Sequence, residues 1–327
     1  MIITFYSYKG GVGRTQLVAN LASYLCYYQD KKVLVIDWDL EAPGLHFFFK
    51  QEENVLKKQG TIDLFNEYLV KIREKRSLEP GEVPFFSKDE HIQPVFQSDG
   101  GGCVDLIPAG KYDAGYSQRV AQFDWFDFYE SWDGAEFIEI LKKRLNTLDY
   151  DMILVDSRTG LSDYTGICNL QLPEMNVVLI GPTKQSFWGV KQVIGYLQDS
   201  PYIKSGNFRK PIIMPILSRI DLQSNVNTNY LMPKFQEEFK SYIFDLVQFI
   251  QEDYKFTEIQ KQTANHFSQC CTTPCFVEIQ HLKFTCNQER ILLLCSRSST
   301  MQSMQRQSAH WHHQVVDAPT KSQVESI

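Results

Sequence analysis

The stretch YSYKGGVGRT, residues Tyr6–Thr15, decides the fold, because it reads as a loop that binds phosphate. It follows a short β-prone run and precedes TQLVANLASYLCYY, whose apolar residues recur at helical spacing. The glycines at 10, 11 and 13 allow a tight path that points successive backbone N–H groups toward an anion at a helix start. The sequence therefore predicts a strand–loop–helix unit around a phosphate.

This loop departs from the common pattern G-x-x-x-x-G-K-[ST] at two positions. Tyr8 replaces the first glycine, and Arg14 replaces the lysine. Arginine keeps the positive charge and can bridge two phosphate oxygens with its fork, although it is bulkier and planar. We expect Arg14 to reach the β/γ-phosphates and Thr15 to place its hydroxyl on Mg²⁺. The predicted nucleotide-binding residues of the loop are Gly10, Gly11, Val12, Gly13, Arg14, Thr15 and Gln16.

Composition excludes several classes of protein. The chain has 327 residues, 43% of them hydrophobic and 22% charged, which is ordinary for a globular protein. A net charge of −6 provides no global basic field for nucleic acid. No apolar run is long enough for a membrane helix, and the N-terminus lacks the basic region of a signal peptide. We expect a cytoplasmic protein, and nothing in the sequence supports contact with DNA or a membrane.

Beyond the loop, continuous apolar runs alternate with amphipathic ones. This pattern indicates a parallel sheet covered on both faces. The predicted fold class is α/β, a doubly wound and mostly parallel sheet with helices on both faces, as in P-loop NTPases. The expected later strands lie in residues 31–39, 103–110, 150–160, 175–183 and 210–221, and the expected later helices in 61–75, with Thr61 as its cap, 135–148 and 186–198.

Two stretches interrupt the alternation. Residues 79–102 are polar and rich in proline and glycine, which predicts a surface loop. Residues 111–133 are dense in aromatic and acidic side chains. We expect the second stretch to be a partly buried excursion, and it is the best candidate for a partner contact outside the nucleotide site.

The segment KGGVGRT resembles the deviant Walker A loop of the MinD/ParA family of P-loop ATPases, whose pattern is KGGxGK[ST]. KGGVGR itself is similar to a recurring bacterial variant of that family. The resemblance, which covers roughly residues 1–250, implies ATP and Mg²⁺ as ligands and an ATP-dependent homodimer. It also implies that Lys9 reaches across the dimer to the partner's ATP, while Arg14 holds the nucleotide of its own chain.

Other segments fit the same resemblance. VLVIDWDLEAPG looks like switch I, where Asp39 would orient the attacking water and Asp37 would support Mg²⁺ or the switch. The alternative is that these acids are solvated and only end a strand. MILVDSRTGLSD looks like Walker B with switch II, where Asp156 would hold Mg²⁺ through water and Gly160 would let the backbone approach the γ-phosphate. Ser218 stands where relatives carry an asparagine that reads adenine, and ATP is favoured over GTP by the family alone.

The end of the chain differs in composition. No glycine follows Gly206, and the last residues are rich in Ser, Gln, Cys and His. Five cysteines lie between Cys270 and Cys295, but their spacing matches no common zinc pattern. We expect residues 1–253 to form the MinD/ParA-like ATPase domain and residues 254–327 to be a disordered or aberrant tail.

Three functions remain open from the sequence. The leading one is an ATP hydrolase that dimerises with ATP bound, resets on hydrolysis and controls an unidentified partner protein. Lys9, Asp39 and Arg14 are then the expected catalytic residues. The second is a nucleotide-binding interaction module with little hydrolysis, which Arg14 motivates. The third is an amidoligase or synthetase-like metabolic enzyme, for which the sequence shows no second substrate motif.

Overall fold

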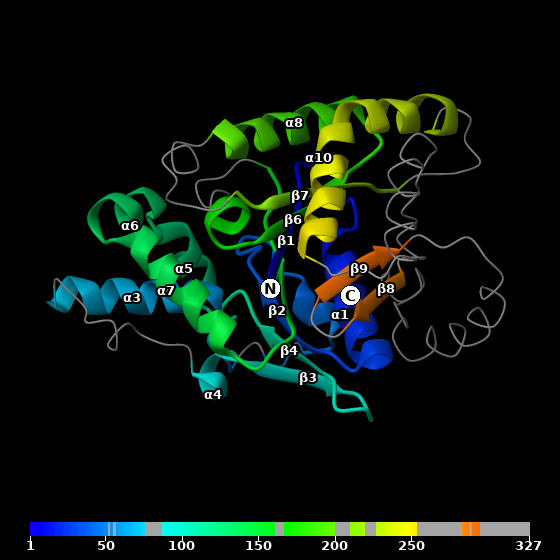
Figure 1. Cartoon of the computed structure of the whole chain (residues 1–327). Coiled ribbons are helices and arrows are strands. Elements are labelled where there is room, and N and C mark those ends of the chain that lie inside the picture. The colour runs from blue at the N-terminus through cyan, green and yellow to red at the C-terminus, as the bar shows by residue number, and fades with distance from the viewer. Residues whose placement is uncertain are drawn as a thin grey trace, which may run out of the picture.

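The computed structural model describes residues 1–253 apart from 52, 55–56, 76–86, 161–166, 200–209 and 220–226, together with 283–287 and 290–294. Its centre is a seven-stranded sheet in the order β3-β4-β2-β5-β1-β6-β7 (Figure 1). Every neighbouring pair is parallel except β3 with β4. The strands are β1 (Ile2–Ser7), β2 (Lys32–Asp37), β3 (Gln93–Gln97), β4 (Cys103–Ile107), β5 (Met152–Asp156), β6 (Met175–Ile180) and β7 (Ile212–Leu217).

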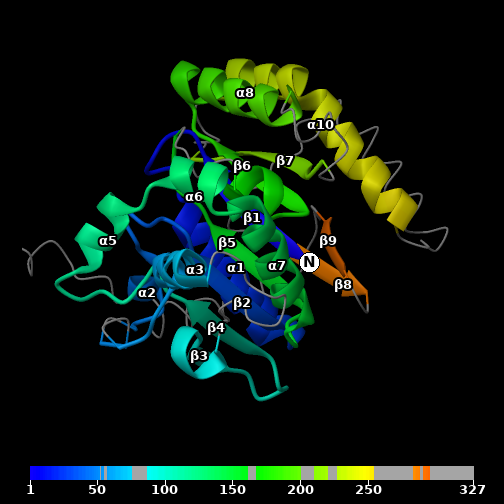
Figure 2. The same cartoon turned by 90° about the vertical axis from the view of Figure 1, so that its left-hand side faces the viewer.

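Helices cover both faces of this sheet (Figures 1 and 2). Side chains alternate between faces along a strand, so Ile3 and Phe5 of β1 pack with one helical layer and Ile2 and Tyr6 with the other. The predicted doubly wound α/β class is confirmed. The helices are α1 (Arg14–Gln29), α2 (Leu45–Phe48), α3 (Thr61–Lys75), α4 (Lys88–His91), α5 (Tyr116–Gln122), α6 (Trp125–Ser131), α7 (Gly134–Thr147), α8 (Lys184–Asp199) and α10 (Met232–Asp253), with π-helical turns at Ile167–Gln171 and Asn227–Leu231.

The layers have different helices. Helix α1 packs with α2 on one face, over residues of β1, β2, β4 and β5. Helices α3, α6 and α7 cover the other face on the β2 side, and α8 and α10 cover it on the β6 side. Among the described residues, no helix combines the length and the apolar character needed to cross a membrane.

The predicted surface loop over residues 79–102 is wrong for its second half. Helix α4 and strand β3 lie there, and β3 pairs antiparallel with β4 as the edge of the sheet. The register shifts between Pro94 and Phe96, which is the irregularity expected where proline occupies an edge strand. Proline and glycine therefore mark a bulged hairpin rather than an unstructured loop. Residues 79–86 lie outside the described residues.

The aromatic stretch 111–133 forms the short helices α5 and α6. Trp125 and Phe128 are buried against α3, where the rings of both contact Phe65 at centroid distances of 5.1 and 5.4 Å. Phe126 is 74% exposed. The stretch is thus the partly buried excursion that its composition predicted, because its aromatic rings complete the core beneath α3.

The prediction that Thr61 caps α3 is wrong. The helix begins at Thr61 itself, and the Thr61 hydroxyl donates to the carbonyl oxygens of Asp37, at 2.9 Å, and Pro108, at 3.3 Å. The carboxylate of Asp63 instead accepts the N–H of Gly60, just before the helix. Thr61 therefore ties the start of α3 to the end of β2.

Little of the tail is described. Strands β8 (Lys283–Asn287) and β9 (Arg290–Leu294) pair antiparallel in a sheet of their own. The expectation that residues 254–327 form a disordered or aberrant tail stays a prediction. The side chains of the cysteines between Cys270 and Cys295 lie outside the described residues.

Tyr8, which follows β1, packs on Gly189 of α8. A β-carbon added at Gly189 would lie 2.1 to 2.3 Å from the Tyr8 ring. Gly189→Ala is expected to lower the free energy of unfolding by about 1–3 kcal/mol, because the ring must move out of a packed position. Gly195, in the same helix, has no atom within 4 Å of such a β-carbon. Gly195→Ala should therefore be neutral or stabilising by up to about 1 kcal/mol. Urea unfolding of both variants measures the difference, and equal stability would contradict the packing.

Candidate functional site

The loop between β1 and α1 has the backbone of a phosphate cradle. Gly11 and Gly13 have φ of 72° and 88°, the left-handed region that favours glycine. Among the described residues, no side chain caps the start of α1, and its first turn contains no acid. The first N–H groups of a helix need partners and carry a partial positive charge. This end of α1 is therefore suited to an anion.

Ser218, which follows β7, fixes this loop from behind. Its hydroxyl donates to the carbonyl oxygen of Val12 at 2.5 Å, and its own N–H donates to Ile180 at 2.9 Å. Ser218 is 1% exposed. The proton of this hydroxyl, at the position where relatives carry an asparagine that reads adenine, is donated to the loop. The structure gives Ser218 the role of a tether between the last strand and the loop.

Two carboxylates stand side by side behind the loop. Asp37 ends β2, Asp156 ends β5, and the two residues are paired in the sheet register. Both are buried. Asp37 accepts the N–H groups of Asp39, Gly44 and Leu45, each at 3.2 Å. Burial, reinforced by Asp156, raises the pKa of Asp37 well above its usual range. Asp37 therefore shapes the turn after β2, which is the supporting part of its predicted role.

Arg14 lies between the carboxylates of Asp39 and Asp156. Its Nε donates to Asp156 at 2.5 Å, and its Nη2 donates to Asp39 at 2.7 Å. The Arg14 side chain is 6% exposed. Burial opposes its charge, but Asp156 and Asp39 outweigh that effect and raise the pKa of Arg14. The alternative of solvated acids at the end of β2 is thus wrong for Asp37, which is buried, while Asp39 is 14% exposed and paired with Arg14.

Thr15 also influences Asp156. The side chain of Thr15 lies near enough that it, like Arg14, opposes the rise in pKa that burial causes at Asp156. The structure therefore brings together four of the predicted residues, Arg14, Thr15, Asp39 and Asp156, with Asp37 directly adjacent.

Two buried atoms in this group lack partners. Nη1 of Arg14 donates to nothing, and Oδ2 of Asp156 accepts nothing, among the described residues. A buried polar atom without a hydrogen bond is costly and calls for an explanation. A free donor suits a phosphate oxygen, and a free carboxylate oxygen suits a cation or its bound water. These residues therefore fit a nucleotide phosphate with Mg²⁺.

The predicted switch II segment contacts the start of the loop. Gly160 has a φ of 77°, its N–H donates to Ser7 at 3.4 Å, and its carbonyl accepts the Tyr6 hydroxyl at 3.1 Å. Arg158 forms an ion pair with Glu41 of the turn after β2. The two predicted switches thus contact each other directly through this pair. Residues 161–166, which continue switch II, lie outside the described residues.

Lys9 and Gln16 lie at the surface. Both are exposed, and Nζ of Lys9 lies 5.8 Å from the centre of the Tyr8 ring. Among the described residues, Lys9 forms no ion pair with a carboxylate. The structure therefore does not bring Lys9 to the acids of its own chain.

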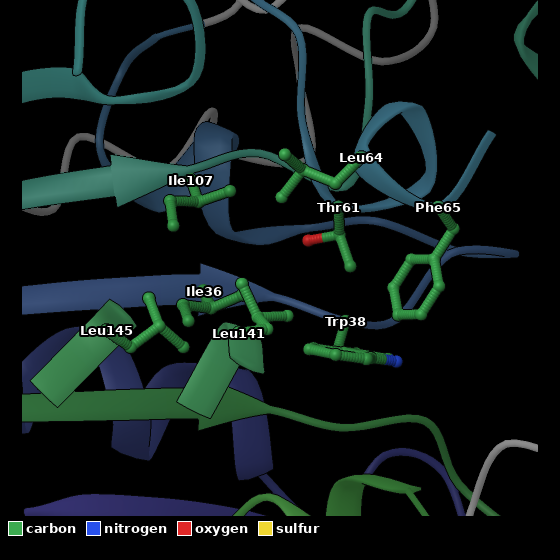
Figure 3. A pocket seen from close by; sticks show the side chains of 8 residues that line it. All are labelled: Ile36, Trp38, Thr61, Leu64, Phe65, Ile107, Leu141 and Leu145. Atoms are coloured by element: carbon green, nitrogen blue, oxygen red, sulfur yellow. The ribbon is translucent and has the colours of Figure 1, made fainter. Parts of the chain in front are cut away.

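Sequence reasoning missed the residues that hold switch I from below. Trp38 is buried against Phe65 with a centroid distance of 5.5 Å, in a narrow apolar space that Leu141 and Leu145 also line (Figure 3). The hydroxyl of Tyr116 donates to the carbonyl of Leu40 at 2.6 Å. The sequence signal for Trp38 was its place as a large apolar residue between Asp37 and Asp39. Polar and apolar residues alternate in this way at the end of a strand that has one face buried.

Comparisons with known proteins agree with this geometry. Residues 1–201 match the family described as an AAA domain. An uncharacterized ATP-binding protein of Methanocaldococcus jannaschii is 27% identical over 207 residues, which are 61% of this chain and 62% of that protein. The matched part thus spans about three fifths of that relative.

Solved structures also resemble this chain. ParA of pNOB8 has a TM-score of 0.51 at 21% identity, over 73% of this chain and 71% of its own. A plasmid partition protein of Borrelia burgdorferi has a TM-score of 0.49 at 20% identity, over 71% and 85%. The septum site-determining protein MinD of Pyrococcus horikoshii, complexed with Mg-ADP, has a TM-score of 0.46 at 21% identity, over 68% and 72%. The likeness to ParA, whose TM-score is above 0.5, confirms the predicted P-loop fold.

The tether assigns a measurable role to Ser218. Ser218→Ala leaves the buried Val12 carbonyl without its donor, so we expect a loss of about 1–2 kcal/mol in the free energy of unfolding. Because the loop and not the base loses a contact, affinities for ATP and GTP should fall by the same factor. Calorimetric titration with both nucleotides measures this. A change in the ratio of the two affinities would show that Ser218 reads the base after all.

Proposed function

Since the chain belongs to the AAA-domain family, we propose that it is a P-loop ATPase whose nucleotide controls dimerisation and, through it, a partner protein. The observation that carries this proposal is the pair of unpartnered atoms, Nη1 of Arg14 and Oδ2 of Asp156, beside the uncapped start of α1. Together they offer a donor, an acceptor and a helix end to one Mg·phosphate group. The ATP-binding relative supports ATP as the nucleotide.

Each residue of the site has a proposed part in binding. The backbone of Gly10 to Thr15 would surround the phosphates, with Arg14 donating to their oxygens. Thr15 and Asp156 would hold Mg²⁺, with Asp37 behind them as a support. Bound Mg²⁺ neutralises charge on the phosphates and fixes their geometry. The backbone of Gly160, on the far side, would contact the γ-phosphate and order switch II.

Hydrolysis needs a positioned water and stabilised charge. Asp39 would orient the water, and Lys9 would reach the nucleotide of the second chain. The exposure of Lys9 supports an action across a dimer, since the side chain forms no ion pair with a described carboxylate of its own chain.

A second candidate function is a nucleotide-binding interaction module with little hydrolysis. It is favoured by the 2.7 Å contact between Arg14 and Asp39, because a carboxylate that neutralises an arginine is not available to orient water. Both candidates include ATP binding and dimerisation, so only the chemical step separates them.

Asp39→Ala separates the two candidates. In the ATPase, this variant should bind ATP and dimerise but hydrolyse ATP at least about 100-fold more slowly, because it loses the group that orients water. Single-turnover hydrolysis of radiolabelled ATP measures the rate, and gel filtration with ATP provides the control for dimerisation. A wild-type rate equally slow as that of the variant would favour the interaction module.

Lys9→Ala tests action across the dimer. The variant should still bind ATP, because Arg14 and the backbone loop remain, but it should neither dimerise with ATP nor hydrolyse it. Nucleotide-dependent mass measurement and steady-state hydrolysis report both properties.

A mixture of Lys9→Ala with Asp39→Ala sharpens this test. In a mixed dimer, the site whose own chain keeps Asp39 is completed by Lys9 of the other chain, so one site in two should recover. Recovery requires that one lysine suffices to hold the dimer. Normal dimerisation and turnover by Lys9→Ala alone would leave only an ordinary phosphate loop.

A further inference from the structure

Arg14 occupies the place between the carboxylates that a divalent cation would need. Its guanidinium contacts Asp156 at 2.5 Å and Asp39 at 2.7 Å, and Asp37 stands next to Asp156 in the sheet. Three acidic side chains so close together repel one another strongly unless a cation lies among them. In the structure described here, the cation is the guanidinium of the loop itself.

We propose that Arg14 is a built-in counter-ion that excludes free divalent cations from the site and ties switch I to the loop until a nucleotide phosphate takes over its guanidinium. This inference rests on the proposed function for the identity of the nucleotide. It adds an order of events, in which phosphate must bind before or together with the metal and never after it.

The fork of arginine makes this arrangement possible. Two of its nitrogens serve Asp156 and Asp39, and the third, Nη1, is buried without a partner. A phosphate bound in the cradle would satisfy this free donor, and its oxygens would compete with the carboxylates for the other two nitrogens. Lysine, with a single nitrogen, cannot hold both carboxylates in the same planar, bidentate manner.

Release of Asp39 would pass directly to switch I. The backbone N–H of Asp39 donates to Asp37, and the N–H of Trp38 donates to the carbonyl of Asp156 at 2.9 Å. Glu41, two residues further, forms the ion pair with Arg158 of switch II. Thus one loop residue contacts both switches through Asp39 and Asp156. The contact between Glu41 and Arg158 connects the same segments at the rim, where both side chains are partly exposed.

The test measures metal binding by the nucleotide-free full-length protein. Mn²⁺ alone serves as the probe, and its free concentration is read from its electron paramagnetic resonance spectrum. The wild-type protein should bind Mn²⁺ poorly. Arg14→Met, which keeps the length of the side chain but removes its charge, should bind Mn²⁺ at least about tenfold more tightly, because the carboxylates lose their internal cation.

Matched variants locate the effect. Arg158→Met removes a neighbouring arginine at the rim and should leave Mn²⁺ affinity within about twofold of wild type, since Arg158 is partly exposed and forms an ion pair with Glu41. Arg14→Met combined with Asp156→Asn should lose the gained affinity, because the carboxylate that holds the metal is gone. An equal gain in Arg14→Met and Arg158→Met would overturn the proposal, because it would show only a change in overall charge.

Two further measurements cover the case in which Arg14→Met does not fold. Arg14→Lys keeps a positive charge and should show a smaller gain than Arg14→Met, with folding checked by circular dichroism. If neither variant folds, Mn²⁺ binding by the wild-type protein provides the test. Tight stoichiometric binding of Mn²⁺ without nucleotide would overturn the proposal. Weak binding that becomes stronger when ATP is added would support it. These measurements need neither hydrolysis nor a dimer. A protein that lacks the proposed ATPase activity can therefore be told apart from one that fails to exclude free metal ions.

Discussion

The contact of Arg14 with Asp39 and Asp156 is the interaction on which the rest of the site depends. Two neighbouring parallel strands, β2 and β5, end in acids at the same edge of the sheet, and a buried carboxylate without a cation is costly. Breaking a buried ion pair by removing one partner typically costs about 3–5 kcal/mol. One guanidinium thus links three parts of the site: the loop, the turn after β2 and the start of α1. The arginine that departs from the family pattern is the residue that joins them.

Much of the fold was predictable from the sequence because its signals are local. Continuous apolar runs predicted β1, β2, β4, β5, β6 and β7, and the glycines at 11 and 13 adopt the left-handed backbone that a phosphate loop requires. The edge strand β3 was missed because its proline and its glycine-rich turn resemble a surface loop. Its pairing with β4 depends on a neighbour that local composition does not reveal.

The candidate site was predictable as a set of positions but not as a set of contacts. Asp37, Asp39 and Asp156 stood out because they end apolar strands, and Arg14 because it replaces a lysine. The sequence did not reveal three tertiary contacts: Ser218 with Val12, Thr61 with the end of β2, and Glu41 with Arg158. Each joins segments 24 or more residues apart, and no short pattern specifies such a partner.

The bond between Ser218 and Val12 has a consequence for biosynthesis. It closes a separation of 206 residues, and it joins the first loop of the chain to the last strand of the main sheet. Contacts of such long range form late in folding, and a growing chain emerges from the ribosome with its N-terminal end first. The phosphate loop is therefore synthesised early but receives its rear support only after β7 has emerged and paired with β6. Until that moment, a nascent chain carries the loop without its rear support.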